Sequence, residues 1–164
     1  YPLPEAQMDR FLFKLRVDYP EAAAERQIVR MLQAEESAPH AVDEPIDPEH
    51  IFTARAEIQA LAVSDPVEKY LVDLVMATRN PQQFGEDLGS WIAVGSSPRA
   101  SIGLHRAARA EAWLSGRDHV LPADVQAVAP AVLRHRLILS YDALADGIDS
   151  DQVITQLLER VAVG

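Results

Sequence analysis

Most of the chain spaces its apolar residues three or four positions apart, which gives an α-helix one apolar face. One such set is Ile51, Ala54, Ile58 and Leu61. The same spacing, with Pro, Ser or Asp near several starts, predicts helices over residues 4–10, 20–35, 48–61, 64–78, 97–115, 123–133 and 150–162, and a brief one within 87–94. Residues 37–45 show no period, so we predict a loop there.

In two stretches the side chains alternate between the two faces that a β-strand would have, which is typical of short strands. Residues 11–17 read Phe-Leu-Phe-Lys-Leu-Arg-Val and predict a strand with one buried side. Residues 134–140 favour a second short strand, and residues 119–121 a short extended piece. The predicted fold is therefore mainly α, a helical bundle with at most a small hairpin. We expect Phe11 and Phe13 to stay partly uncovered, with their strand pairing to another copy or lying against the bundle.

The stretch around Arg99 carries the clearest helix-start signal in the chain. Ser97 is a good N-cap, Pro98 suits the first helical position, and Gly116 follows the predicted end. A cation in the first turn opposes the helix dipole by about 0.3–1 kcal/mol. We therefore expect an outside group to compensate for Arg99, and a bound anion is one candidate.

This helix is basic in an acidic protein. The chain carries a net charge of −10, whereas residues 97–117 hold four arginines and one glutamate, a local +3, which leaves −13 for the rest. The acidic total argues against non-specific nucleic-acid binding, which relies on cations at phosphates. A plainer alternative stays open, in which these arginines only pair with acidic neighbours.

Arg10 is the second arginine in an unusual setting, between a short predicted helix and the predicted strand. One interpretation is a surface pair with Asp9 or a glutamate, worth under about 1 kcal/mol. The other is a guanidinium that reaches a phosphate on a neighbouring molecule, for which its permanent charge and forked donors are suited.

The sequence lacks the residues that several kinds of site require. The chain has no cysteine, no glycine-rich phosphate loop, no nucleophile elbow and no close pair among its five histidines, so we expect neither a metal site nor hydrolase chemistry of its own. No apolar run is long enough to span a membrane, and the first residues lack the charged-then-apolar pattern of a leader sequence, so we expect neither feature. We expect a cytoplasmic protein, and the start at Tyr-Pro-Leu-Pro without Met suggests a piece of a longer one.

Four motifs in order resemble the MoxR-type AAA+ ATPases. Residues 1–11, Tyr-Pro-Leu-Pro-Glu-Ala-Gln-Met-Asp-Arg-Phe, look like the segment after the sensor-1 strand, and residues 95–100, Gly-Ser-Ser-Pro-Arg-Ala, look like the sensor-2 motif. Residues 116–125 and 132–137 are similar to the family's C-terminal lid. The resemblance implies a lid with a short strand left from the ATPase core. It divides the chain into residues 1–18 of the core, connecting helices over 19–62, and the lid over 63–164.

The resemblance also implies roles for both arginines. Arg10 matches the arginine finger, a catalytic residue that enters the ATP site of the adjacent subunit in a ring. Arg99 matches sensor 2, which contacts the γ-phosphate in cis or in trans, with Pro98 beside it in the nucleotide-binding motif. ATP and Mg would be held by a core with Walker A and Walker B motifs upstream of Tyr1, so this chain alone should be inactive.

The resemblance further implies chaperone-like remodelling or assembly of partner proteins, with a von Willebrand factor A domain protein as a partner class. A second hypothesis is a free-standing acidic helical adaptor that binds proteins and has no nucleotide role. A helical DNA-binding protein is a third, weaker alternative, because only one short helix face is basic.

Overall fold

The computed structural model describes residues 3–37 and 45–163. The chain divides into two compact units: a larger one that comprises the residues up to Lys14 and from Arg55 onward, and a smaller one over Leu15–Ala54. All the residues of the candidate site belong to the larger unit.

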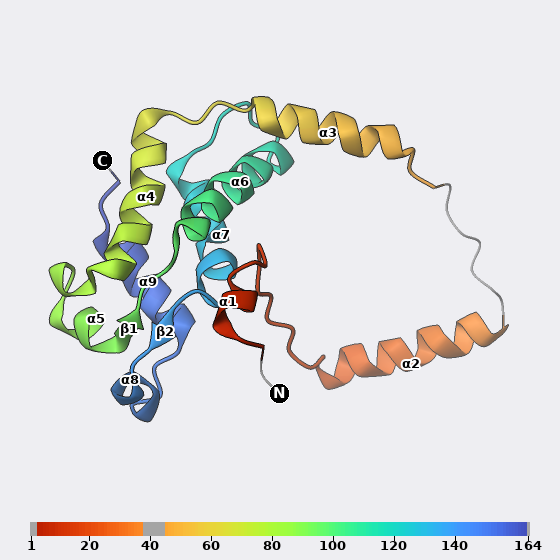
Figure 1. The fold of residues 1–164 in the computed structure, drawn as a ribbon. Helices are drawn as coiled ribbons and strands as arrows, with labels where there is room; N and C mark the ends of the chain where they lie inside the picture. The colour runs from red at the N-terminus through yellow and green to blue at the C-terminus, as the bar shows by residue number, and fades with distance from the viewer. Residues whose placement is uncertain (1–2, 38–44, 164) are drawn as a thin grey trace. The chain divides into compact units, whose positions relative to one another are not determined.

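The elements follow one another as helices with two very short strands between them (Figure 1). In chain order they are α1 (Glu5–Met8), α2 (Ala22–Ser37), α3 (Pro48–Ala60), α4 (Asp65–Arg79), the 3-10 helix η1 (Pro81–Gln83), α5 (Glu86–Trp91), β1 (Ile92–Val94), α6 (Pro98–Leu114), α7 (Pro122–Leu133), β2 (Ile138–Leu139), α8 (Tyr141–Ala145) and α9 (Ser150–Arg160). The predicted helices are confirmed, with ends shifted by a few residues, whereas η1 and α8 were not predicted.

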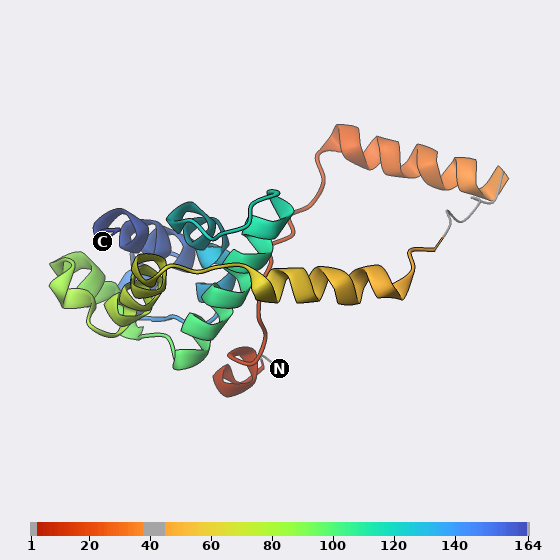
Figure 2. The ribbon, with the colours of Figure 1, turned by 90° about the horizontal axis from the view of Figure 1, so that it is seen from above.

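Helices α4, α6, α7 and α9 form the bundle of the larger unit (Figures 1 and 2). Their facing side chains are buried, as Leu74 of α4, Leu104 of α6, Leu133 of α7 and Leu157 of α9 illustrate. Each such side chain contributes about 1.5–3 kcal/mol through removal from water. The small residues of α6 that let α7 approach closely are buried too: Ala100, Ala107, Ala108 and Ala112.

A two-stranded antiparallel sheet lies beside the bundle, where β1 contacts α4. Ile92 of β1 pairs with Leu139 of β2, and Val94 pairs with Ile138. The second strand expected in residues 134–140 is thus confirmed in a shorter form. Residues 119–121 contribute one isolated bridge, between His119 and Ala62.

The strand predicted over residues 11–17 is not present as a strand in the described chain. Its amides bind helices rather than a strand: the Phe11 N–H donates to the Met8 carbonyl at 3.1 Å, and the Lys14 N–H donates to the Ala131 carbonyl at 2.9 Å. Because no neighbouring strand supplies a ladder, side chains of residues 134–136 bind its carbonyls instead. Residues 11–14 therefore lie against the bundle, and Phe11 and Phe13 remain 58% and 40% exposed, as expected.

The smaller unit contains α2 and the start of α3. The apolar residues of α2 that recur at helical spacing are exposed, including Ile28 at 43% and Leu32 at 54%. The middle of the predicted loop, residues 38–44, lies outside the described residues.

Candidate functional site

The start of α6 has the geometry that the sequence predicts. The Ser97 hydroxyl accepts a hydrogen bond from the Arg99 N–H at 3.2 Å, and Pro98 occupies the first turn. This arrangement satisfies one of the backbone donors that a helix start leaves without a partner. The side chain of Arg99 is 54% exposed, so it lies at the surface rather than inside the bundle.

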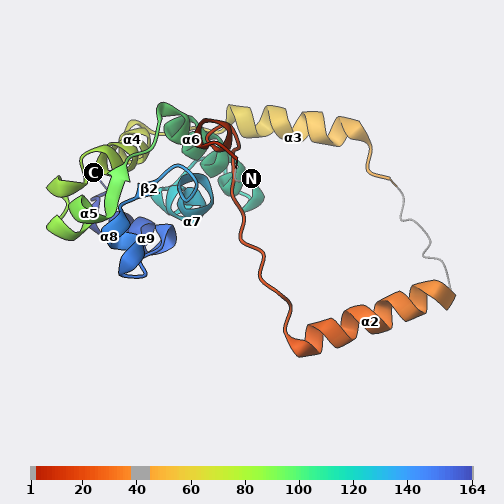
Figure 3. The same cartoon turned by 60° about the horizontal axis from the view of Figure 1, so that its bottom comes forward.

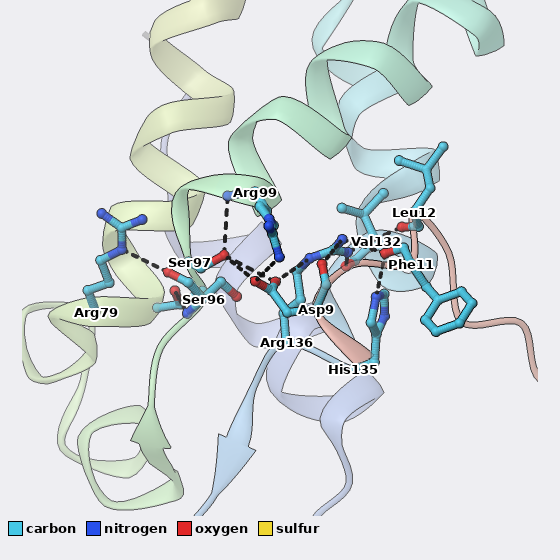
Figure 4. A network of polar contacts seen from close by, with 11 residues as sticks. Asp9, Phe11, Leu12, Arg79, Ser96, Ser97, Arg99, Val132, His135 and Arg136 are labelled. Carbon is cyan, nitrogen blue, oxygen red and sulfur yellow. Dashed lines mark hydrogen bonds and ion pairs between the residues drawn. The ribbon is translucent and has the colours of Figure 1, made fainter. Parts of the chain in front are cut away.

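The loop that leads into α6 is fixed to the end of α4 (Figure 4). The Ser96 N–H donates to Thr78 Oγ1 at 2.9 Å, and Arg79 Nε donates to the Ser96 carbonyl at 2.8 Å. A Cβ on Gly95 would lie 2.4 Å from the Thr78 carbonyl oxygen, so only glycine allows this close approach. The backbone of Arg99 is therefore held by its neighbours and not by its own helix alone.

Asp9 lies beside this helix start, because α1 and the start of α6 are neighbours (Figure 3). The Ser97 hydroxyl donates to Asp9 Oδ2 at 2.9 Å. Arg99 Nη1 lies 3.7 Å from the same oxygen, which is a loose ion pair, and the opposite oxygen pairs with Arg136 Nε at 3.1 Å. The carboxylate of Asp9 thus supplies part of the compensation that a cation at a helix start requires.

Arg10 follows Asp9 directly and is exposed. Within residues 3–37 and 45–163, its guanidinium forms no hydrogen bond or ion pair. The surface pair between Arg10 and Asp9 that we considered from the sequence is therefore not formed. Asp9 instead binds groups that are far away in the sequence.

Arg10 and Arg99 line the same cavity, of about 310 Å³, on the surface of the larger unit. Four arginines and one aspartate are among the residues that line it. The full lining is Asp9, Arg10, Leu12, Arg99, Ile102, Gly103, Arg106 and Arg136. Arg106 is exposed and has no polar partner among the described residues, so the rim of the cavity is strongly cationic. Such a rim suits the phosphate groups of a ligand.

Arg136 was not identified from the sequence as a site residue. Its side chain is only 3% exposed, and it binds Asp9 and the backbone of residues 9–12. A signal was present, since Arg136 belongs to a short polar group, residues 134–136, with apolar residues directly before and after it, and a charge in such surroundings needs a partner. The sequence alone did not indicate that the partner is Asp9.

Burial changes the titration of two neighbouring groups. It lowers the pKa of Arg136, although Asp9 opposes the shift, and Arg136 stays charged at neutral pH. Burial also lowers the pKa of His135, so this ring is neutral at pH 7. Its Nε2 lies 3.0 Å from the Phe11 carbonyl oxygen and donates to it in the matching tautomer.

One arginine of the basic stretch 97–117, Arg117, pairs with an acidic neighbour, as the plainer alternative expected. Its guanidinium forms two hydrogen bonds with Asp124, at 2.6 and 2.5 Å. Asp124 also accepts a hydrogen bond from the Leu121 N–H at 2.8 Å, so the Arg117–Asp124 pair lies at the first turn of α7. Arg117 therefore has a structural partner, unlike Arg106 within the described chain.

The described residues contain no group of three or more His, Cys, Asp or Glu side chains placed to hold a metal ion. Nor does any helix in this part of the chain combine the length and apolar character that a membrane crossing needs.

A family model of the AAA lid domain matches residues 90–157. The chain is 46% identical over 169 residues to Chaperone MoxR1 of Mycobacterium tuberculosis, covering 99% of this chain and 43% of the relative. It is 35% identical to protein MoxR of Paracoccus denitrificans, over 85% of this chain and 44% of the relative. A crystal structure of a Cytophaga hutchinsonii protein assigned as an ATPase matches with a TM-score of 0.91 and 39% identity, over 99% of this chain and 49% of that one.

The chain belongs to the MoxR-type AAA+ ATPases. It spans less than half the length of these MoxR relatives, between 43% and 44%. The matched lid domain contains Pro98, Arg99 and Arg136, whereas Asp9 and Arg10 precede it. The cationic cavity is thus formed jointly by the AAA lid and the segment around α1.

Proposed function

We propose that this chain is the nucleotide-sensing part of a ring-forming ATPase, and that Arg99 and Arg10 act at its ATP sites. Arg99, with Pro98 fixing its helix start, contacts the γ-phosphate as sensor 2. Arg10 enters the site of the adjacent subunit as an arginine finger. ATP and Mg are held mainly by a core outside this chain.

The observation that carries the proposal is the exposed pair of guanidiniums on one cavity. Arg99 is 54% exposed and only loosely paired, and Arg10 has no polar partner in the described part of the chain. Structural arginines of the same unit look different, since Arg117 and Arg160 each bind a carboxylate with two nitrogens. Available guanidiniums with fixed backbones are what phosphate binding requires.

ATP hydrolysis develops negative charge on the transferring phosphoryl group, and positioned cations stabilise that charge. The residues described here supply this electrostatic help and the orientation of the two arginines. Lid movement, driven by contact between Arg99 and phosphate, would couple hydrolysis to chaperone-like remodelling of partners, including a von Willebrand factor A domain protein.

Steady-state ATP turnover of the full-length protein tests this proposal. We expect Arg10→Ala and Arg99→Ala each to lower turnover at least about tenfold, because each removes a cation from the transition state. Circular dichroism and the melting temperature should stay close to wild type, since both side chains are exposed. Lys69→Ala is a matched control, because Lys69 is an exposed cation of α4 that pairs with Asp73 and lies away from the cavity. Unchanged turnover in both arginine variants would refute the assignment.

A further inference from the structure

Arg136 directs every one of its donors to an acceptor, and most of these acceptors belong to residues 9–12 (Figure 4). A guanidinium carries five N–H groups. Nε donates to Asp9 Oδ1 at 3.1 Å. Nη1 donates to the Leu12 carbonyl at 3.2 Å and to the Val132 carbonyl, and Nη2 donates to the carbonyls of Asp9 at 3.1 Å and Phe11 at 2.5 Å.

Residues 9–12 need such an anchor because they form turns and bends, with no helix or strand of their own. Backbone carbonyls without a ladder must find other donors when they are covered. Arg136 provides these donors from the end of α7, and His135 adds a contact to the Phe11 carbonyl at 3.0 Å. The path of the backbone on both sides of Arg10 is therefore set by the lid.

Asp9 extends the same network to α6. One carboxylate oxygen accepts from Arg136, and the other accepts from the Ser97 hydroxyl at 2.9 Å, beside Arg99. The chain of contacts from Arg136 through Asp9 to Ser97 thus joins the segment that bears Arg10 to the helix that bears Arg99.

We propose that Arg136 is a positioning residue, which acts through Asp9 and the carbonyls of residues 9–12 to hold Arg10 in a fixed relation to Arg99. The inference rests on the proposed function of those two arginines. A general contribution to stability does not explain the arrangement well, since desolvation offsets much of the attraction in a buried ion pair. Orientation is the stronger reason, because small misplacements of a group that acts on the reaction cost large factors in rate.

The first test compares kinetics in the full-length protein. We expect Arg136→Gln, and the gentler Asp9→Asn, to lower kcat at least about tenfold while KM for ATP changes less than about twofold. Arg160→Gln is the matched control, because Arg160 binds Asp87 and the Phe84 carbonyl but nothing in residues 9–12. This control should lower the melting temperature and leave kcat within about twofold.

The second test asks whether Arg136 acts through Arg10. In an Arg10→Ala background, Arg136→Gln should lower kcat by no more than about twofold further, because the group that it positions is gone. If Arg10→Ala lowers kcat and Arg136→Gln does not, only the present inference is overturned. An unchanged kcat in Arg10→Ala overturns the proposed function, and the inference with it.

Hydrogen exchange gives a readout that does not depend on activity. The amide of Lys14 bonds to Ala131, and the amide of Phe11 to Met8. In Arg136→Gln both should exchange at least about tenfold faster, while the amides of α4 keep their protection. Exchange of residues 11–14 at the wild-type rate would show that Arg136 does not hold the segment, and would overturn the inference.

Discussion

At the scale of single residues, the position of Arg99 depends on a neighbour without a side chain. Gly95 lies against the backbone at the end of α4, where an added Cβ would be 2.4 Å from the Thr78 oxygen and 2.8 Å from the Arg79 nitrogen. Both atoms belong to the backbone, so neither can swing aside. The backbone that leads into α6 therefore lies tightly against the end of α4 at Gly95.

Gly95→Ala should therefore lower the free energy of unfolding by about 1–3 kcal/mol, as overpacked sites do. Thermal or urea unfolding of the chain measures this loss. Ser96→Ala is the matched control, because its hydroxyl is buried without a hydrogen-bond partner among the described residues, and its removal should cost nothing. Equal melting temperatures for Gly95→Ala and wild type would contradict the tight contact.

Asp9 and Arg136 show why part of the site escaped prediction. The two residues are 127 positions apart, and the Ser97–Asp9 bond spans 88 positions. Local rules identify Ser97 as a cap and Arg99 as a cation at a helix start, because both depend only on neighbours in the sequence. They do not indicate which distant carboxylate approaches, so Asp9 looked like a partner for Arg10.

At the scale of elements, α5 and α9 are joined by one bidentate ion pair. Arg160 near the end of α9 binds both oxygens of Asp87 at 2.6 Å, and also the Phe84 carbonyl at 3.0 Å. This hydrogen bonding lowers the pKa of Asp87 from 3.8 to about 2. Since the folded pKa is depressed, the stabilisation is present above pH 3.8 and is lost as pH falls through about 2.

Arg160→Gln should thus be less stable than wild type at neutral pH, and the difference should shrink as the pH falls from 3.8 toward 2. Melting temperatures measured across this range give the comparison. Asp87→Asn removes the titrating carboxyl itself and should show the same loss of acid dependence. A constant difference between wild type and Arg160→Gln down to pH 2 would contradict the cause assigned to the shift.

The elements that the sequence predicted well are those whose signals are local. The helices follow from apolar spacing and from caps such as Ser97. Residues 11–17 have strand-like alternation, yet a strand forms only when another strand supplies the ladder, and the described chain offers none there. Strand β1 lies within the stretch 87–94, where we predicted a brief helix. Local spacing does not indicate this strand, because its partner β2 lies over forty residues later.

At the scale of the whole molecule, the chain belongs to the MoxR-type AAA+ ATPases, and we propose roles for three of its residues. The fold class was predicted from the spacing of apolar residues and the MoxR-type relationship from motifs, and both are confirmed. The roles of Arg10, Pro98 and Arg99 remain predictions. They agree with a cavity that four arginines help to line, whereas a stand-alone adaptor would have no need of that arrangement.

The most direct measurement is a structure of the full-length protein with Mg and a slowly hydrolysed ATP analogue. The account predicts that the Arg99 guanidinium lies within about 3 Å of a γ-phosphate oxygen, with Arg10 at a γ-phosphate across a subunit boundary. It would be contradicted if both guanidiniums faced solvent or bound only carboxylates while the nucleotide was in place.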